Sequence, residues 1–278
     1  MNWLRVAQAP PPRWHSSSDT SILHPFMEGI LTAGMLFGVG LTAGFVDAIA
    51  GGGGLITVPA LLWAGLPPAV ALGTNKLQSS CGTTVAVWNY SRADLIPWKR
   101  LLLPITLAFL SAMVGSWTVS RVPRESLRRC IPVLLGCVAV YTWRQPSLGR
   151  VARPARWSWT AGLTVAAVAL GFYDGFMGPG TGSFWTLVLV VGFGLELSSA
   201  TGTTKALNLA SNLGSLILFA ATGLIDIQIG LIMAAGQLVG ARLGSGLVIR
   251  RGAALIRPVF LTVVIVLTVK LFWDVLGH

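Results

Sequence analysis

A glycine-rich, polar passage occurs twice in a chain that is otherwise strongly hydrophobic. The first copy runs from Gly44 to Lys76 and the second from Gly171 to Lys205. Each copy has an aspartate near its start (Asp47, Asp174), a glycine cluster in its middle and a lysine at its end. The aspartates are 127 residues apart and the lysines 129, so a two-residue insertion separates the copies. Hydrophobic segments interrupted by glycine at corresponding positions of two halves are typical of the binding site of secondary transporters.

The composition indicates that the bilayer is the solvent of this chain. Of its 278 residues, 54% are hydrophobic and 10% are charged, and the mean hydropathy is +0.73. Soluble domains have about 25% charged residues. Apolar runs such as Thr186–Leu195 lack the alternation of a transmembrane β-strand. We therefore expect an all-α integral membrane protein that crosses the cell (inner) membrane several times.

The apolar runs predict two homologous halves of four to five transmembrane helices each. An N-terminal tail (1–24) precedes the first repeat (25–143), and a basic linker (144–156) leads to the second repeat (157–278). The predicted spans are 25–48, 52–66, 69–91, 99–120 and 126–143, and then 157–177, 181–195, 198–222, 227–249 and 254–275.

The second span of each half is too short to cross the membrane as a helix. About 15 residues reach only about 22 Å, whereas the hydrocarbon core is about 30 Å thick. We predict that both are short or re-entrant helices that begin at a glycine cluster at membrane depth. Five true spans per half would make the repeats inverted, and four spans with a re-entrant segment would make them parallel.

Positive charge is concentrated in the connectors, and the net charge is +11. Loops that meet anionic lipid have this distribution, and no compact basic domain indicates nucleic-acid binding. With five spans per half, the connectors 92–100, 144–156 and 250–257 share the more basic face, which predicts that this face is cytoplasmic. The expected partners are the lipid bilayer and a small anion, and a homo-oligomer is left open.

Two aspartates and two lysines lie inside predicted spans at matching positions of the two halves: Asp47 and Asp174, Lys76 and Lys205. A charge at mid-membrane costs at least about 2.5–3.5 kcal/mol, so each must face a cavity or a partner. We expect both lysines to have a functional role and not a purely structural one. The aspartates could pair with the lysine of their own half, cap a short helix, or couple transport to protons.

The glycine clusters let the backbone turn sharply and approach a ligand closely. A helix that starts there directs its N–H groups and the positive end of its dipole toward the cavity, so the predicted ligand is an anion. The candidate substrate-binding residues are Gly51, Gly52, Gly53, Gly54, Thr74, Asn75, Lys76, Gln78, Gly178, Gly180, Thr181, Thr203, Thr204, Lys205, Asn208 and Asn212.

These motifs resemble those of the sulfite exporter TauE/SafE family of membrane transporters. The matching stretches are Gly44–Leu61, Ala71–Gln78, Gly202–Lys205 with Asn208 and Asn212, and Gly240–Gly244. The resemblance extends over about residues 30 to 275 and implies export of sulfite or of organosulfonates such as sulfoacetate. In the second half, Gly178–Gly182 (Gly-Pro-Gly-Thr-Gly) stands where the first half has four glycines, so the two half-sites are not equivalent.

Two other classes of function, an enzyme and a cation transporter, fit the sequence less well. The three histidines lie outside the apolar spans, which removes histidine-based catalytic dyads and the H-E-x-x-H zinc motif. We expect no enzymatic activity, no cofactor and no metal site. A cation or metal ion transporter that uses Asp47 and Asp174 is the alternative. It ranks second because each aspartate has a lysine in its own half.

The sequence thus leads to a hypothesis of alternating access. A small oxyanion binds near the membrane midplane between the two glycine-initiated helix ends, and Lys76 and Lys205 balance its charge. The two halves then rock around this site and open it to each side in turn.

Overall fold

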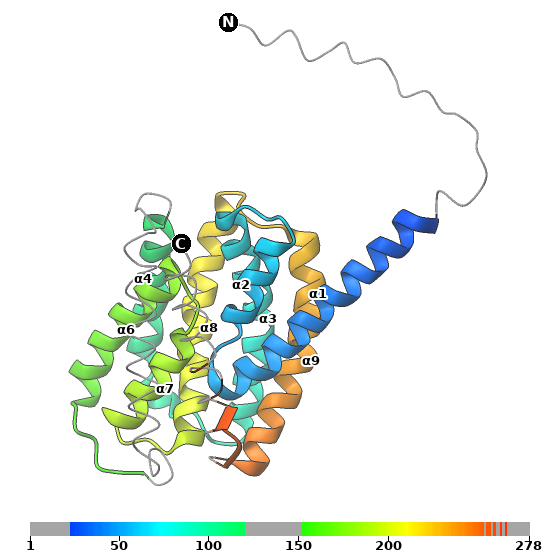
Figure 1. Cartoon of the computed structure of the whole chain (residues 1–278). Helices are drawn as coiled ribbons and strands as arrows, with labels where there is room; N and C mark the ends of the chain where they lie inside the picture. The colour runs from blue at the N-terminus through cyan, green and yellow to red at the C-terminus, as the bar shows by residue number, and fades with distance from the viewer. Residues whose placement is uncertain are drawn as a thin grey trace, which may run out of the picture.

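The computed structural model describes residues 23–119 and 152–252 and, beyond them, positions 254–256, 258, 259, 262 and 265. Every regular element in these residues is a helix (Figure 1). The elements are α1 (Leu23–Ala50), α2 (Gly54–Trp63), α3 (Pro68–Arg92), the 3₁₀ turn η1 (Trp98–Arg100), α4 (Leu102–Thr118), α6 (Trp159–Phe176), α7 (Thr181–Val191), α8 (Leu197–Ala221) and α9 (Ile227–Arg251). The predicted span 126–143, most of 254–275, the tail 1–22 and linker residues 144–151 lie outside the described residues.

The two glycine clusters end long helices and start short ones. Gly51, Gly178 and Gly180 have φ angles of 76°, 84° and 84°, a region that glycine adopts without steric cost. After these turns come α2, with 10 residues, and α7, with 11. Helices of this length span about 15–17 Å, roughly half of a hydrocarbon core. Both begin at the glycine clusters and end three to four residues before the predicted bounds.

Helices that open the two halves run in opposite directions. In Figure 1, α1 descends from the upper right, whereas α6 rises from the lower left. The short helices α2 and α7 likewise point away from each other, α2 upward and α7 downward. Inverted repeats would have this relation. The division of the whole chain into two repeats stays a prediction, because the fifth predicted span of each half is outside the described residues or nearly so.

Helices from different halves pack in close pairs. A Cβ atom on Gly240 of α9 would lie 2.0 Å from the carbonyl oxygen of Leu41 in α1. One on Gly175 of α6 would lie 2.0 Å from the carbonyl oxygen of Ala112 in α4. Glycine therefore lets α1 contact α9, and α4 contact α6, backbone to backbone, as small residues do in membrane helix pairs.

Because helices from different halves pair in this way, the described helices form two bundles that do not coincide with the two halves. We call α1, α2, α3 and α9 the first bundle, and α4, α6, α7 and α8 the second bundle. The main contact between the bundles is made by α3 against α8, one helix from each half. The two halves of the chain are consequently interleaved and do not form separate lobes.

The molecule exposes apolar side chains and buries charged ones. Leu102 and Val165 are 78% and 68% exposed, whereas Lys76 and Lys205 are 2% and 0% exposed. This is the reverse of a soluble protein, in which lysine is almost never fully buried. By length and composition, the segments Leu31–Ala50 and Ile227–Arg251 are the ones among the described helices that could cross a membrane. Helices α3 and α8 are as long as α9 but carry the buried polar side chains.

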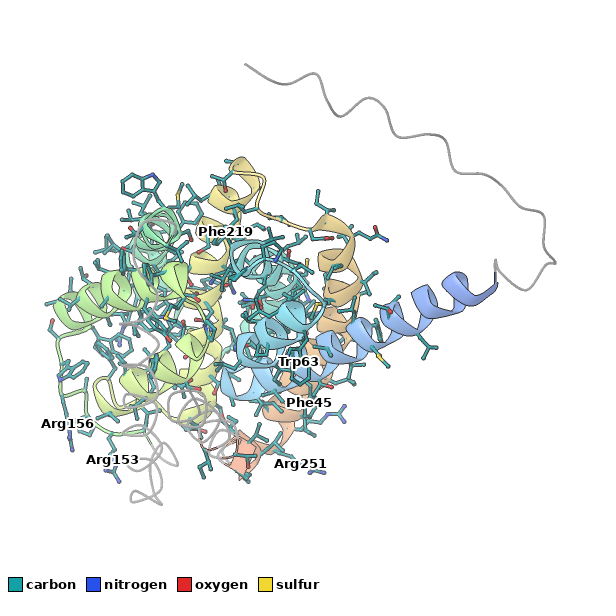
Figure 2. All side chains as sticks on the ribbon, turned by 45° about the horizontal axis from the view of Figure 1, so that its top comes forward. Phe45, Trp63, Arg153, Arg156, Phe219 and Arg251 are labelled. Carbon is teal, nitrogen blue, oxygen red and sulfur yellow. The ribbon has the colours of Figure 1, made fainter. Side chains whose placement is uncertain are left out.

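Basic side chains of several connectors gather at one end of the molecule. Figure 2 shows Arg153, Arg156 and Arg251 at the same end, where α6 begins and α9 ends. Arg100 lies there too, because its guanidinium is stacked on Trp159 at the start of α6. These residues belong to the three connectors that the sequence predicts to share the more basic face.

Candidate functional site

The two short helices meet at their N-terminal ends in the middle of the bundle. A Cβ atom on Gly51 would lie 2.5 Å from the Cα atom of Gly182, and one on Gly182 would lie 2.5 Å from the Cα atom of Gly51. The two glycine turns are therefore in direct backbone contact. Ser183 also donates a hydrogen bond to the carbonyl oxygen of Ala50, at 3.2 Å. The positive ends of two helix dipoles thus converge on one region.

The two lysines and two aspartates form two ion pairs, and each pair joins the two halves of the chain. Lys76 Nζ lies 2.8 Å from Asp174 Oδ1, and Lys205 Nζ lies 2.9 Å from Asp47 Oδ2. Pairing of each aspartate with the lysine of its own half, one of the roles that the sequence left open, does not occur. The reason is the contact of α3 with α8, which directs each lysine toward the aspartate at the end of the other half's first helix.

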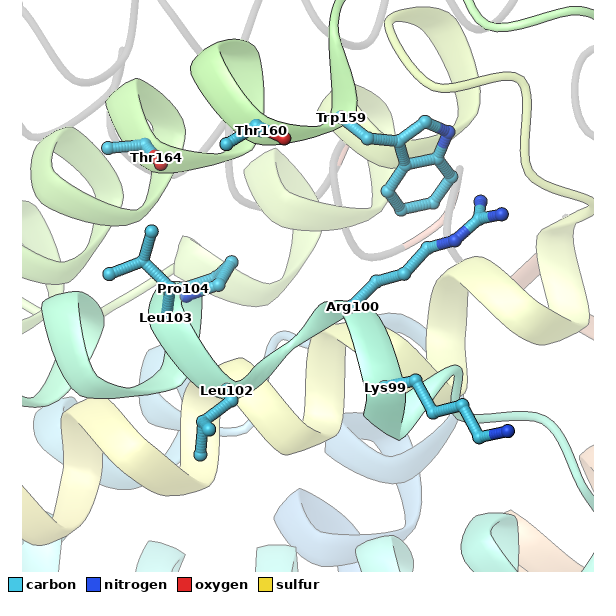
Figure 3. Close-up of a pocket in the computed structure, with 8 residues that line it drawn as sticks. All are labelled: Lys99, Arg100, Leu102, Leu103, Pro104, Trp159, Thr160 and Thr164. Carbon is cyan, nitrogen blue, oxygen red and sulfur yellow. The ribbon is translucent and has the colours of Figure 1, made fainter.

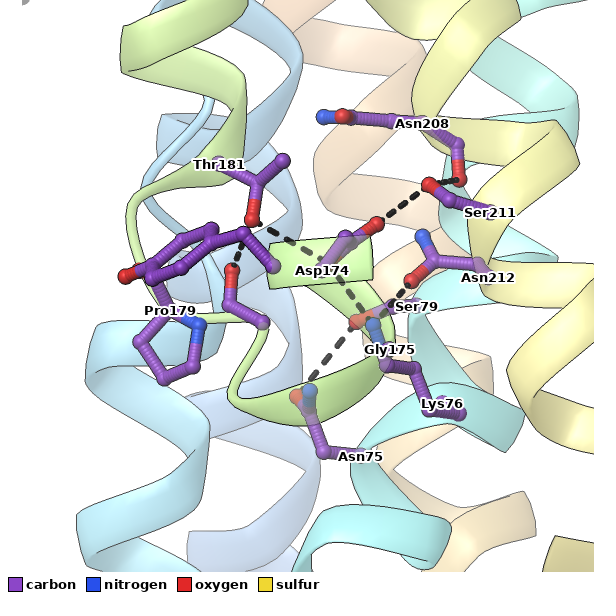
Figure 4. A network of polar contacts seen from close by, with 12 residues as sticks. Asn75, Lys76, Ser79, Asp174, Gly175, Pro179, Thr181, Asn208, Ser211 and Asn212 are labelled. Carbon is purple, nitrogen blue, oxygen red and sulfur yellow. Dashed lines mark hydrogen bonds and ion pairs between the residues drawn. The ribbon is translucent and has the colours of Figure 1, made fainter. Parts of the chain in front are cut away.

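Asp174 is held by a dense hydrogen-bond network (Figure 4). Its side chain is 5% exposed. Oδ1 accepts from Lys76 at 2.8 Å and from the hydroxyl of Thr181 at 3.2 Å, and Oδ2 accepts from Ser211. Lys76 also donates to Asn212 Oδ1 at 3.0 Å. This pair has the full set of partners that a buried ion pair needs.

Asp47 has a different environment from Asp174. Its side chain is 20% exposed. Oδ1 accepts the backbone N–H of Gly53 at 3.1 Å, just before α2 begins, and Oδ2 accepts from Lys205. Asp47 thus forms an ion pair and also binds the backbone of the residue that precedes α2. The two pairs are related in position but unequal in exposure and in the number of donors.

A cavity of about 30 Å³ lies between the two glycine turns. Its walls are formed by Asp47, Gly51, Gly54, Asn75, Lys76, Ser79, Asp174, Gly178, Gly180, Thr181, Gly182, Asn208 and Asn212. A cavity of this size holds about one or two water molecules.

Several candidate residues of the sequence analysis are not in the cavity wall. They are Gly52, Gly53, Thr74, Gln78, Thr203, Thr204 and Lys205. Thr74 accepts the N–H of Asp226 at 2.9 Å and so contacts the start of α9, and Thr204 shares a 3.2 Å hydrogen bond with Thr186. Lys205 is not in the cavity wall but binds Asp47, which is. The assignment of these side chains to the substrate stays a prediction.

Three further residues complete the site. Ser79 and Gly182 line the cavity, and Ser211 binds Asp174. The helical period places Ser79, three residues after Lys76, on the same face of its helix. Gly182 closes the second glycine cluster, and its contact with Gly51 could not be read from the sequence.

One polar atom in the cavity wall is without a partner. Asn208 Oδ1 is buried and has no hydrogen bond to any residue that the structure describes. Nearly all buried polar atoms of proteins are hydrogen-bonded, so such an atom indicates that water or a ligand completes the site. If the side-chain amide of Asn208 were rotated by half a turn, its NH₂ group would point to the position of Oδ1. The hydrogen bonds of the amide decide which of these two orientations is adopted.

Comparison with known proteins finds relatives over nearly the whole chain. The profile described as "Sulfite exporter TauE/SafE" matches residues 36–271. The chain is 41% identical to the "Probable membrane transporter protein YfcA" of Escherichia coli K12 over 253 residues. These residues are 91% of this chain and 94% of that protein. A "Probable membrane transporter protein" of Haemophilus influenzae is 39% identical over 246 residues, 88% of this chain and 96% of its own length. No solved structure matches.

Proposed function

The chain belongs to the sulfite exporter TauE/SafE family of membrane transporters, and on this basis we propose that it carries a small anion through the central cavity. The resemblance inferred from its motifs is thereby confirmed. The proposed cargo is sulfite or an organosulfonate, exported across the cell (inner) membrane by a multi-pass protein. The cavity between the glycine turns is the proposed binding site.

One observation supports an anion above all others: two helix N-termini meet at this cavity beside two buried lysines. Backbone N–H groups and the positive helix ends favour negative charge, and an ammonium group adds a full positive charge. Discontinuous helices of transporters use their N-terminal ends for anionic substrate groups in the same way.

Each lysine is already paired with an aspartate in this structure. An anion must therefore replace a carboxylate as the partner of a lysine, or a proton must neutralise that carboxylate. We infer that Asp47 is the carboxylate that the anion replaces or that becomes protonated. It is the more exposed of the two, and it has one backbone donor besides Lys205, whereas Asp174 is surrounded by Lys76, Thr181 and Ser211.

Anion binding by the purified protein tests this proposal. A ligand at 100 times its dissociation constant stabilises the folded state by about 2.7 kcal/mol, so sulfite or sulfoacetate should raise the apparent Tm. Lys205→Met should remove the shift, and Asp47→Asn should increase it, because the competing carboxylate is gone while the lysine remains. Arg250→Gln, which removes an exposed charge at the end of α9, serves as the matched control and should behave as the parent protein.

The opposite pattern would favour the alternative function. If Ca²⁺ or another cation stabilises the protein and the anions do not, the site transports a cation through Asp47 and Asp174. In that case Asp47→Asn should abolish the shift. The pairing of both aspartates with lysines argues against this alternative, since each carboxylate charge is already balanced.

We further infer that the moving bodies are the two bundles and not the two halves of the chain. Contacts of α1 with α9 and of α4 with α6 are made backbone to backbone, and packed interfaces of this kind resist sliding. Both ion pairs and the contact of Gly51 with Gly182 instead cross the boundary between the bundles. Separation of the bundles along α3 and α8 would open the cavity and break both pairs.

A crosslink between the halves within one bundle distinguishes the two motions. Asn89 in α3 donates a 2.7 Å hydrogen bond to Ser245 in α9, and both residues belong to the first bundle but to different halves. In a protein without its native cysteines, a short thiol crosslinker joining Asn89→Cys to Ser245→Cys should leave anion flux in proteoliposomes unchanged. The same protein without the crosslinker is the control. Flux that stops on crosslinking would mean that the halves move as units.

A further inference from the structure

A second, larger hollow lies away from the central cavity, between the N-terminal ends of α4 and α6 (Figure 3). Its volume is about 590 Å³. Helix α4 lines it with Leu102, Leu103 and Pro104, and α6 lines it with Trp159, Thr160 and Thr164, while Lys99 and Arg100 come from η1. We call this hollow the α4–α6 groove. Among the residues that the structure describes, it shares no lining residue with the central cavity.

The cationic end of the groove is positioned by an aromatic ring. The guanidinium carbon of Arg100 lies 4.9 Å from the ring centroid of Trp159, within the range of a cation–π contact. Trp159 is in turn packed against Phe193, with ring centroids 5.0 Å apart. No carboxylate of the described residues forms an ion pair with Lys99 or Arg100. The two positive charges are therefore available to an anionic ligand.

Two further features of the groove matter for its ligand. Helices α4 and α6 both begin here, so their positive dipole ends reinforce the two cations. Next to the charges, Leu102 and Leu103 are 78% and 51% exposed. The groove thus joins a positively charged end to exposed apolar side chains at the start of α4, with two threonines of α6 on its other wall.

We propose that the α4–α6 groove binds an anionic phospholipid. The phosphate would contact Lys99 and Arg100, and an acyl chain would cover the leucines of α4. Basic pockets between membrane helices on the cytoplasmic side bind anionic headgroups, and this groove lies at the end where the arginines of the connectors gather. A soluble phosphate would match the cations and leave the exposed leucines at the start of α4 uncovered. The site is independent of the nature of the cargo.

Lipid titration of the detergent-purified protein tests the proposal. Native mass spectrometry should count phosphatidylglycerol bound to the protein at concentrations where phosphatidylcholine does not bind, and phosphatidylglycerol should raise the apparent Tm more. Lys99→Gln with Arg100→Gln should weaken the binding by roughly fivefold for each charge removed. Arg250→Gln with Arg251→Gln removes two exposed charges at the same end, outside the groove, and should leave the binding unchanged.

A second variant separates the groove from surface charge. Thr160→Trp fills the groove at an exposed position and leaves both cations in place, so it should also lose the bound lipid. The proposal fails if phosphatidylcholine binds equally well, or if the Lys99 and Arg100 variant binds as the parent protein does. It also fails if inorganic phosphate produces the same thermal shift, or if Thr160→Trp retains the lipid.

Discussion

Replacing Lys76 by methionine is expected to abolish anion flux in proteoliposomes and to lower the stability of the protein strongly. The substitution leaves Asp174 as a buried carboxylate with only hydroxyl donors, Thr181 and Ser211. Removing one partner of a buried ion pair costs about 3–5 kcal/mol. Flux measured with radiolabelled or fluorescently detected sulfite, together with the apparent Tm in detergent, checks both parts of this prediction.

Two companion variants distinguish a loss of function from a loss of fold. Lys76→Met combined with Asp174→Asn removes both charges and should restore much of the stability without restoring flux. Lys205→Met should abolish flux at a smaller cost in stability, since Asp47 is 20% exposed and keeps the N–H of Gly53. Unchanged flux in both single lysine variants would show that these ammonium groups do not balance the charge of the substrate.

Alanine at Gly51 is expected to disrupt the site as severely. The new Cβ atom would lie 2.5 Å from the Cα atom of Gly182, and the φ angle of 76° is unfavourable for any residue with a side chain. The left-handed backbone alone costs about 1–2 kcal/mol, and the clash would force the two short helices apart. We expect loss of flux and a clear decrease of the apparent Tm, measured in the same two assays.

Gly65 provides a matched control for the backbone part of this effect. It has a φ angle of 87°, and a Cβ atom there would meet nothing within 4 Å. Gly65→Ala should therefore show the conformational cost without the clash and should retain flux. If Gly51→Ala is no worse than Gly65→Ala, the contact between the glycine turns is not essential for the site.

Much of the central site could be predicted from the residues themselves. Asp47 and Lys76 recur as Asp174 and Lys205, and such charges are tolerated in apolar segments only where they face a cavity or a partner. The glycine clusters predicted short helices at the correct places, because only glycine adopts the φ angles of these turns at no cost. Local conformation and the cost of burying charge act within a few residues, so they are visible in the sequence.

The partner of each charge could not be predicted in this way. Asp47 binds Lys205 across 158 positions of the chain, and Lys76 binds Asp174 across 98. Thr74, a candidate for substrate binding, contacts the start of α9 instead. These outcomes depend on which helices lie side by side, and no local pattern encodes that choice.

The sequence by itself determined that this is a helical membrane transporter with glycine-broken short helices and with an aspartate and a lysine at matching positions in the apolar segments of each half. The tertiary structure alone decided that the halves interleave, that α1 packs on α9 and α4 on α6, and that both ion pairs cross between the bundles. The physical reason is that helices in a bilayer pair where small residues allow a close fit. Gly240, for example, packs directly against the backbone of Leu41. That fit is a property of two distant segments together.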